Sequence, residues 1–461
     1  MMSQPLLIIN VAGLGTSAVG PLTPNISRLS EKGTGALAVK PPVPALTSPC
    51  QATLLTGSPP AEHGIVSNGW YFRDLAQILN WQRSGNLVAG ESLWQAARVV
   101  SPNLQCANLF WRYATHSACN VNVVERPTYW ADGRKSPDIY TEPGSVRDEL
   151  VERFGPFPLF RFWGPVADIQ STRWIVDATI HCVEQDRFGL VLTYIPHLDY
   201  DHQRFGPGSE QGKQALRDMD REVGRLIEAA FARGMNVAVV SDYAFEPVSC
   251  PVFLNRALRE AGLVTVQRAE NGELLEPGAC KAFAVCDQQA AHIYVNDQFE
   301  IQKTKRLLET LHGVQRVYDR REMGELELDH PRAGELFAIA EPGCWFAYPY
   351  WLDESHAPDF AHCVAIHAKP GWDPSELFWR PGPRGTLHLA KRMLQKALRI
   401  RAPFDLISGD MSLVGGSHGR IPASDEHCPV FITSWPLQQT GSIRMQDIKP
   451  LLLQRLGRPK L

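Results

Sequence analysis

The chain has 461 residues, with 46 Lys+Arg, 49 Asp+Glu and 44% hydrophobic residues. Typical domains have roughly 100–200 residues, so this length favours a large globular core with an insert. The net charge of −3 excludes a chain built to neutralise nucleic-acid phosphates or to coat an anionic membrane, and the apolar content excludes bulk disorder. The composition is that of an ordinary soluble protein.

The apolar segments of the first half predict a parallel sheet. In chain order, we expect strands at 5–10, 36–40, 189–195 and 236–240, and helices at 24–29, 48–55, 210–234 and 252–261. Apolar strands that alternate with helices are typical of a mostly parallel sheet flanked by helices. Ligands bind beyond the carboxyl ends of such strands. We therefore expect the chemistry at Asn10, Asp199 and Asp242.

The pattern changes after residue 280. Short strands are expected at 282–285, 292–295, 314–318 and 336–340, around a helix at 298–311. A Pro/Gly/Arg-rich loop is expected at 380–385, before a glycine-rich tip at 415–419 and a last strand at 429–433. We predict an α/β core over 1–265 and 410–461 and a smaller α+β cap over 270–405.

Cysteines and apolar runs bear on the cellular location. The ten cysteines include no Cys-x-x-Cys pair, which indicates free thiols in a reducing compartment. The apolar run at 6–9 is too short for a secretion signal, and no run reaches the roughly 18–20 residues that span a bilayer. We predict a cytoplasmic protein without a membrane span.

Thr47 stands just before the helix expected at 48–55. The first amides of a helix and its dipole attract anions, although most threonines at such a position are simple N-caps. Thr47-Ser-Pro-Cys50 and, later, Glu62-His63-Gly64 together resemble the nucleophile motif of the nucleotide pyrophosphatase/phosphodiesterase branch of the alkaline phosphatase superfamily. Further motifs of that family follow in its order, at Asp199–Pro207, Ser241-Asp242-Tyr243 and Gly416-Ser-His-Gly419. The resemblance implies an alkaline phosphatase-like sandwich with a cap, and Thr47 as the nucleophile.

The resemblance also implies two metal sites. The first would comprise Asp199, Gln203 and His418, and the second Asn10, Thr47, Asp242 and Tyr243. Gln203, Asn10 and Tyr243 depart from the family's His, Asp and His. Zinc prefers N and S ligands, whereas Mg²⁺ and Mn²⁺ accept carboxylate, carbonyl and water. We therefore expect Mn²⁺ or Mg²⁺ rather than two zinc ions, with one ion or none as alternatives.

Several other side chains are candidates for substrate binding. Cys50 stands where the family has a phosphate-binding Asn. Arg126 and Lys135 lie in a basic, aromatic-rich stretch that suits phosphate oxygens and planar groups, although it could equally cover the sheet edge. His367 lies in a Gly/Pro-rich loop and is either a ligand-facing or a satisfied loop histidine. His202 could replace Gln203 if the helix were shifted by one residue.

The leading hypothesis is a metal-dependent hydrolase of a phosphate ester or phosphodiester in a small metabolite. Thr47 would attack in line, and the helix amides would take the developing charge. Two alternatives stay open. One is a catalytically altered or inactive family member that binds a phosphorylated ligand, and the other is a phosphoryl-transfer or isomerase enzyme that uses the same cleft. The sequence leaves the oligomeric state open.

Overall fold

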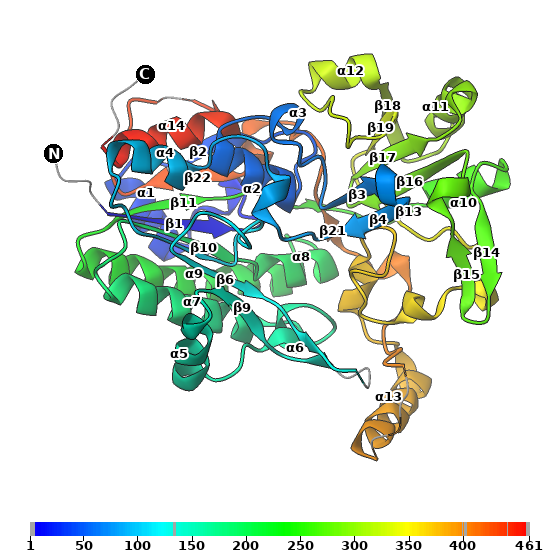
Figure 1. The fold of residues 1–461 in the computed structure, drawn as a ribbon, viewed down its shortest axis with the longest axis horizontal. Helices are drawn as coiled ribbons and strands as arrows, with labels where there is room; N and C mark the ends of the chain where they lie inside the picture. Colours follow the sequence, from blue (N-terminus) through cyan, green and yellow to red (C-terminus); the bar gives the residue numbers. More distant parts are fainter. Residues whose placement is uncertain (1–4, 132–134, 399, 401–402, 440, 458–461) are drawn as a thin grey trace.

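The computed structural model describes residues 5–131, 135–398, 400, 403–439 and 441–457. A large sheet with helices on both faces lies beside a second, smaller sheet (Figure 1). This is the α/β fold with a mostly parallel central sheet that the sequence predicts. None of the helices in the described part of the chain combines the length and the hydrophobicity needed to cross a membrane.

The central sheet has nine strands in the order β23-β2-β22-β11-β1-β10-β5-β6-β9. Their bounds are β1 Leu6–Val11, β2 Leu37–Lys40, β5 Cys106–Leu109, β6 Val121–Glu125, β9 Ile139–Glu142, β10 Leu190–Ile195, β11 Asn236–Val240, β22 Val430–Thr433 and β23 Ile443–Arg444. Strand β1 is parallel to β10 and β11, and β5 is parallel to β10 and β6. Strand β22 is antiparallel to β11 and β2, and β9 to β6. The sheet is therefore parallel at its centre.

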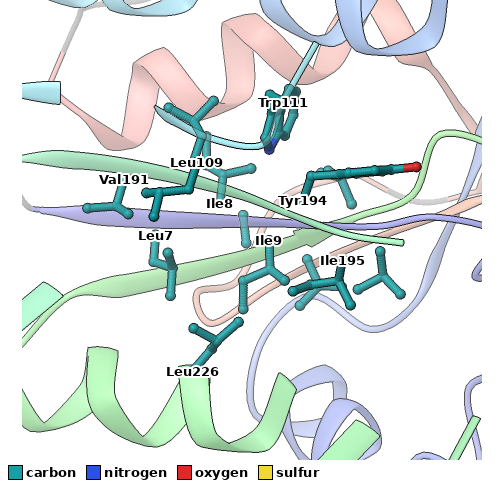
Figure 2. Packing of buried hydrophobic residues seen from close by; sticks show 14 of the residues in the cluster. Leu7, Ile8, Ile9, Leu109, Trp111, Val191, Tyr194, Ile195 and Leu226 are labelled. Atoms are coloured by element: carbon teal, nitrogen blue, oxygen red, sulfur yellow. The ribbon is translucent and has the colours of Figure 1, made fainter. Parts of the chain in front are cut away.

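Helices cover both faces of this sheet, which explains why β1 and β10 are apolar and buried throughout. On one face, α1 (Pro24–Lys32) and α7 (Ile169–Glu184) contact α9 (Glu210–Ala232). On the other, α14 (Ile448–Arg455) contacts α2 (Thr47–Thr56) and α4 (Leu93–Val100). Successive β1 side chains alternate between the faces, with Ile9 directed toward the helix that carries Leu226 and Ile8 away from it (Figure 2).

The second sheet is antiparallel, with the order β16-β17-β19-β18. Its strands are β16 Ala282–Asp287, β17 Ala290–Val295, β18 Val314–Asp319 and β19 Leu336–Ala340. Helices α10 (Leu254–Glu260), α11 (Ile301–Glu309) and α12 (Arg320–Glu325) lie nearby. A second hydrophobic cluster is centred here and also contains Trp70 and Tyr113 from the first half of the chain. The boundaries at 265–270 and 405–410 stay a prediction.

The loop expected at 380–385 is wrong, because most of this segment belongs to a helix. Helix α13 (Gly382–Ala397) begins inside it and projects from the molecule (Figure 1). Pro383 is the second residue of this helix, where a missing N–H costs no intrahelical hydrogen bond. Proline at this position therefore marked the start of a helix, not a loop.

Candidate functional site

The carboxyl ends of three adjacent strands bring the polar residues of the site to one edge of the sheet. Asn10, near the end of β1, lies between Tyr194 of β10 and Val240 of β11. Asp242 follows β11 by two residues, and Asp199 lies in α8 (Leu198–Phe205), the short helix after β10. The side chains of Asn10 and Asp242 are buried, and that of Asp199 is half-buried. The topology thus explains why segments far apart in the sequence share one site.

Thr47 is linked to Asp199 through a tyrosine. It is the first residue of α2 and is 3% exposed, with its Oγ1 3.3 Å from the phenol oxygen of Tyr243. Tyr243 donates a hydrogen bond of 2.8 Å to Asp199 Oδ1. Tyr194 donates to the other carboxylate oxygen at 3.4 Å. Both oxygens of Asp199 therefore accept from tyrosines, and Tyr243 joins the carboxylate to the threonine hydroxyl.

His418 completes this part of the site. It follows the short strand β21 (Gly416–Ser417), and its ring stacks on Tyr243 with centroids 3.5 Å apart and an interplanar angle of 4°. Its Nδ1 lies 2.9 Å from the carbonyl oxygen of Ala45, so Nδ1 carries the proton and Nε2 keeps its lone pair. Burial lowers the pKa of His418 to about 3, which keeps the ring neutral at pH 7.

The two aspartates of the site interact electrostatically. Burial and, to a smaller extent, the charge on Asp242 raise the pKa of Asp199 to about 8. Burial also raises the pKa of Asp242 to about 7. Two buried acids close together disfavour double ionisation. In the metal-free chain, the pair therefore changes its protonation near neutral pH.

The second predicted metal set, Asn10, Thr47, Asp242 and Tyr243, includes buried oxygen atoms that have no hydrogen-bond partner in the described part of the chain. Within the described residues, both polar side-chain atoms of Asn10 and the Oδ2 of Asp242 are buried without a hydrogen-bond partner. Amide, carboxylate and hydroxyl oxygens are ligands that Mg²⁺ and Mn²⁺ accept. The donor chemistry of Asn10, Asp242 and Thr47 therefore fits one hard divalent cation.

Two of the three residues of the first predicted metal set, Asp199 and Gln203, have oxygen atoms that already accept hydrogen bonds, so this set is less suited to binding a cation. The oxygens of Asp199 are engaged with tyrosines, and Gln203 Oε1 accepts a hydrogen bond of 3.2 Å from Gln288. His202 does not replace Gln203, because its ring packs against Phe245 and its Nε2 lies 3.4 Å from the Gly212 carbonyl. Across the described ranges, no three His, Cys, Asp or Glu side chains gather where they could hold a metal ion.

The first amides of α2 are largely occupied, contrary to the expectation that they stabilise the developing charge. The N–H of Ser48 donates to Asn68 Oδ1 at 2.9 Å, that of Cys50 donates to the Leu46 carbonyl at 3.0 Å, and Pro49 has none. Asn68 itself lines the cavity at Thr47. A ligand at Thr47 would therefore meet the side chain of Asn68 rather than a row of free helix amides.

Asn68 is a residue of the site that the sequence did not reveal. Asp287, at the end of β16, accepts hydrogen bonds from the Asn68 backbone N–H at 3.1 Å, from its side-chain amide at 3.3 Å and from Ser67 Oγ at 2.9 Å. The second sheet thus holds in place the side chain that caps the helix of Thr47. The run Ser67-Asn-Gly69 reads as an ordinary turn, so only the fold reveals this role.

A cavity of about 1510 Å³ opens onto the site, and its wall includes Thr47, Asp199, Tyr243 and His418. Lys135 and His367 also line it, and His367 Nδ1 lies 3.2 Å from the Asn80 carbonyl oxygen. The remaining substrate-binding candidates lie elsewhere.

Arg126 and Cys50 are not among the residues that line the cavity. The exposed guanidinium of Arg126 lies over the ring of Tyr140 at 5.4 Å. Cys50 is fully buried in α2, where burial and the charge on Asp242 raise its thiol pKa. The structure therefore brings Lys135 and His367, but not these two residues, to the cavity wall.

The model of one protein family, described as type I phosphodiesterase/nucleotide pyrophosphatase, matches residues 6–373. The chain belongs to this family. An uncharacterised pyrophosphatase/phosphodiesterase of Schizosaccharomyces pombe is 28% identical over 236 residues, which are 49% of this chain and 41% of that protein. Human ectonucleotide pyrophosphatase/phosphodiesterase family member 1 is 23% identical over 57% of this chain and 26% of its own length. The chain thus matches less than half the length of these relatives.

Two solved structures of low sequence identity share the fold over nearly the whole chain. An inactive variant of murine ectonucleotide pyrophosphatase/phosphodiesterase 5, in complex with AMP, is 16% identical with a TM-score of 0.60. Phosphonoacetate hydrolase from Sinorhizobium meliloti 1021, in complex with phosphonoformate, is 14% identical with a TM-score of 0.63. Each match covers 99% of this chain and 96% of the other. The alkaline phosphatase-like fold inferred from the motifs is therefore confirmed.

Proposed function

We propose that this member of the phosphodiesterase family hydrolyses a phosphate ester or phosphodiester of a small metabolite, with Thr47 as the nucleophile. The observation that carries the proposal is the hydrogen-bonded series from Thr47 Oγ1 through Tyr243 to Asp199, on the wall of a large cavity. Family membership supports phosphoester hydrolysis as the reaction class.

The residues supply a route for the proton of the nucleophile. As Thr47 Oγ1 bonds to phosphorus, its proton passes to the Tyr243 oxygen while the Tyr243 proton passes to Asp199 Oδ1. The ester P–O bond breaks, and the leaving oxygen takes up a proton from water. A water molecule then breaks the bond between phosphorus and Thr47 Oγ1: its hydroxyl joins phosphorus, which leaves as phosphate or a phosphate monoester. Thr47 regains its proton from Asp199 by way of Tyr243. A base is most effective when its pKa lies near the working pH, and burial raises the pKa of Asp199 to about 8.

Asn10, Asp242 and Thr47 are the residues that would hold a single Mg²⁺ or Mn²⁺. When bound, such an ion neutralises charge on the phosphoryl group and favours the ionised hydroxyl. The unpartnered oxygens of Asn10 and Asp242 support this placement. Asn68 and His418 act on the substrate directly, because both line the same cavity as Thr47.

A small substrate is favoured over a polymer. The structural neighbours were solved with AMP and with phosphonoformate, both small ligands. The net charge of −3 also gives no general attraction to nucleic acid.

Turnover of an aryl phosphodiester with added Mg²⁺, Mn²⁺ or Zn²⁺ tests the proposal. We expect hydrolysis that depends on Mg²⁺ or Mn²⁺ and that falls at least about 100-fold in Thr47→Ala, since the nucleophile is lost. Thr310→Ala, an exposed threonine at the end of α11, is the matched control and should retain full activity. Undiminished turnover in Thr47→Ala would reject Thr47 as the nucleophile.

A ligand-binding role is the second candidate, and the first metal set favours it. Asp199 and Gln203 are engaged by tyrosines and Gln288 instead of being free for a metal. This candidate predicts no turnover of monoesters or diesters with any of the three metals, together with saturable binding of inorganic phosphate that Thr47→Ala weakens. Elemental analysis of the purified protein adds the metal content.

A further inference from the structure

Three cationic side chains line the same cavity as Thr47. Arg83 follows strand β4 (Gln77–Asn80), Arg112 follows β5, and Lys135 begins the short strand β8 (Lys135–Ser136). Glu125, at the end of β6, also lines the cavity and lies next to the two arginines. Three segments remote in sequence thus supply an excess of positive charge at one place.

The two arginines share a single oxygen of Glu125. Arg112 Nη1 lies 2.9 Å and Arg83 Nε 3.6 Å from Glu125 Oε1. Arg112 is only 9% exposed and Glu125 only 5%. Within the described ranges, the Nε atoms of both arginines are buried without a hydrogen-bond partner. A buried N–H without an acceptor is unfavourable, so Glu125 alone does not fully pair the two guanidinium groups.

Arg112 is held rigidly next to the reaction site. Its backbone N–H donates to Gln51 Oε1 at 2.8 Å, and Gln51 lies one helical turn after Thr47 on α2. Its guanidinium carbon lies over the ring of Trp81 at 4.7 Å. Its charge reaches Asp199, whose pKa it lowers against the larger, raising effect of burial. The cationic group and the phosphoryl site are therefore adjacent parts of one cavity.

Lys135 adds a third charge to this group. Partial desolvation at the cavity wall lowers the pKa of this exposed lysine, and the charge on Arg83 acts in the same direction. The nearby carboxylate of Glu376, whose charge acts in the opposite direction, is already paired with the buried Lys369 at 2.7 Å. Glu125 thus pairs with the two arginines and Glu376 with Lys369, so one further anion would balance the three cations better.

We propose that Arg83, Arg112 and Lys135 form a second anion subsite, so that the substrate carries a second anionic group beside the scissile phosphoryl group. The inference rests on the proposed function in that it places the phosphoryl group at Thr47. Arginine forks and the lysine ammonium bind carboxylate and phosphate oxygens alike, and both groups fit this chemistry.

Calorimetric titration of the full chain with matched probes tests the subsite without requiring turnover. Ethylphosphonate, propylphosphonate and butylphosphonate carry one anionic group. Phosphonoacetate, 3-phosphonopropionate and 4-phosphonobutyrate add a carboxylate at increasing distances. Methylenediphosphonate replaces the carboxylate with a phosphonate and so distinguishes the two sources of charge. We expect at least one doubly anionic probe to bind about tenfold or more tightly than its matched partner, as one charge-assisted hydrogen bond allows.

Substitution assigns this gain to the proposed residues. Arg83→Gln and Lys135→Gln should each remove most of it, and both proteins should fold because the Arg83 side chain is 23% exposed and Lys135 is exposed. Arg217→Gln, an exposed arginine on α9, is the matched control and should keep the full gain. Thermal melting of each variant verifies folding.

The outcomes separate this inference from the proposed function. A gain that depends on Arg83 and Lys135 supports the subsite even if no ester is hydrolysed, because the titration measures binding alone. Absence of a gain in every pair, or a gain that survives both substitutions, would overturn the subsite and leave hydrolysis at Thr47 unaffected.

Discussion

Tyr243 stands where the family resemblance places a metal-binding histidine, and its surroundings explain how a phenol can occupy that position. Its ring lies flat on His418, and its oxygen lies between Thr47 and Asp199. The burial that raises the pKa of this phenol keeps it protonated and able to donate. The residue therefore serves as a hydrogen-bond link rather than as an anionic metal ligand.

Tyr243→Phe tests this link, since it removes the oxygen but retains the stacked ring. We expect kcat for an aryl phosphodiester to fall about 10- to 100-fold, within the range of general acid–base contributions, with little change in Tm. Tyr318→Phe on β18 is the control and should match the unaltered protein. Undiminished kcat in Tyr243→Phe would show that the proton leaves Thr47 by another route.

Asp242 allows the metal proposal to be checked through binding. Because an ion that binds only the folded chain stabilises it by mass action, we expect Mn²⁺ or Mg²⁺ at millimolar concentration to raise Tm. Asp242→Asn should abolish the rise, whereas Asp218→Asn on the outer helix α9 should keep it. A rise that persists in Asp242→Asn would place the ion elsewhere.

Helices and strands could be predicted from the sequence where the pattern of hydrophobic residues determines the structure. The buried runs of β1, β10 and β11 predicted the sheet, and its parallel centre put Asn10, Asp199 and Asp242 at one edge. Neither Asn68 nor Arg83 could be predicted as a site residue, because their partners come from segments remote in sequence. Arg126 shows the reverse case, since a basic, aromatic stretch does not reveal which of its side chains face a cavity.

The buried Asp287 of β16, which binds the loop at Asn68, makes the free energy of unfolding depend on pH. Burial raises the pKa of Asp287 from 3.8 to about 6. Between these values the folded chain binds more protons than the unfolded chain, so the free energy of unfolding falls as pH rises. The contribution of Asp287 is fully present below about pH 4 and is lost through pH 6, with a total of about 3 kcal/mol.

Urea denaturation between pH 4 and 7 measures this effect. Asp287→Asn should flatten the pH dependence, because the neutral amide does not ionise but still offers an oxygen to Ser67 and Asn68. Asp148→Asn, a substitution of an exposed aspartate on α5 (Ser145–Phe154), should leave the slope unchanged. An unaltered slope in Asp287→Asn would contradict the assignment.

At the scale of the whole molecule, helix α2 joins the two halves. All ten of its residues are buried. Cys50, Leu54 and Leu55 belong to the hydrophobic cluster of the large sheet, and Ala52 belongs to that of the smaller sheet. Helix α2 can therefore be exposed to solvent only if both hydrophobic clusters are disturbed.

This double attachment has a consequence for hydrogen–deuterium exchange. Since α2 cannot open while either sheet keeps its packing, its amides should exchange only through cooperative unfolding of the chain and be among the slowest. The exposed helix α13 should exchange far faster. Mass spectrometry of peptides from both helices measures the difference, and fast exchange in α2 would show that the two sheets separate without global unfolding.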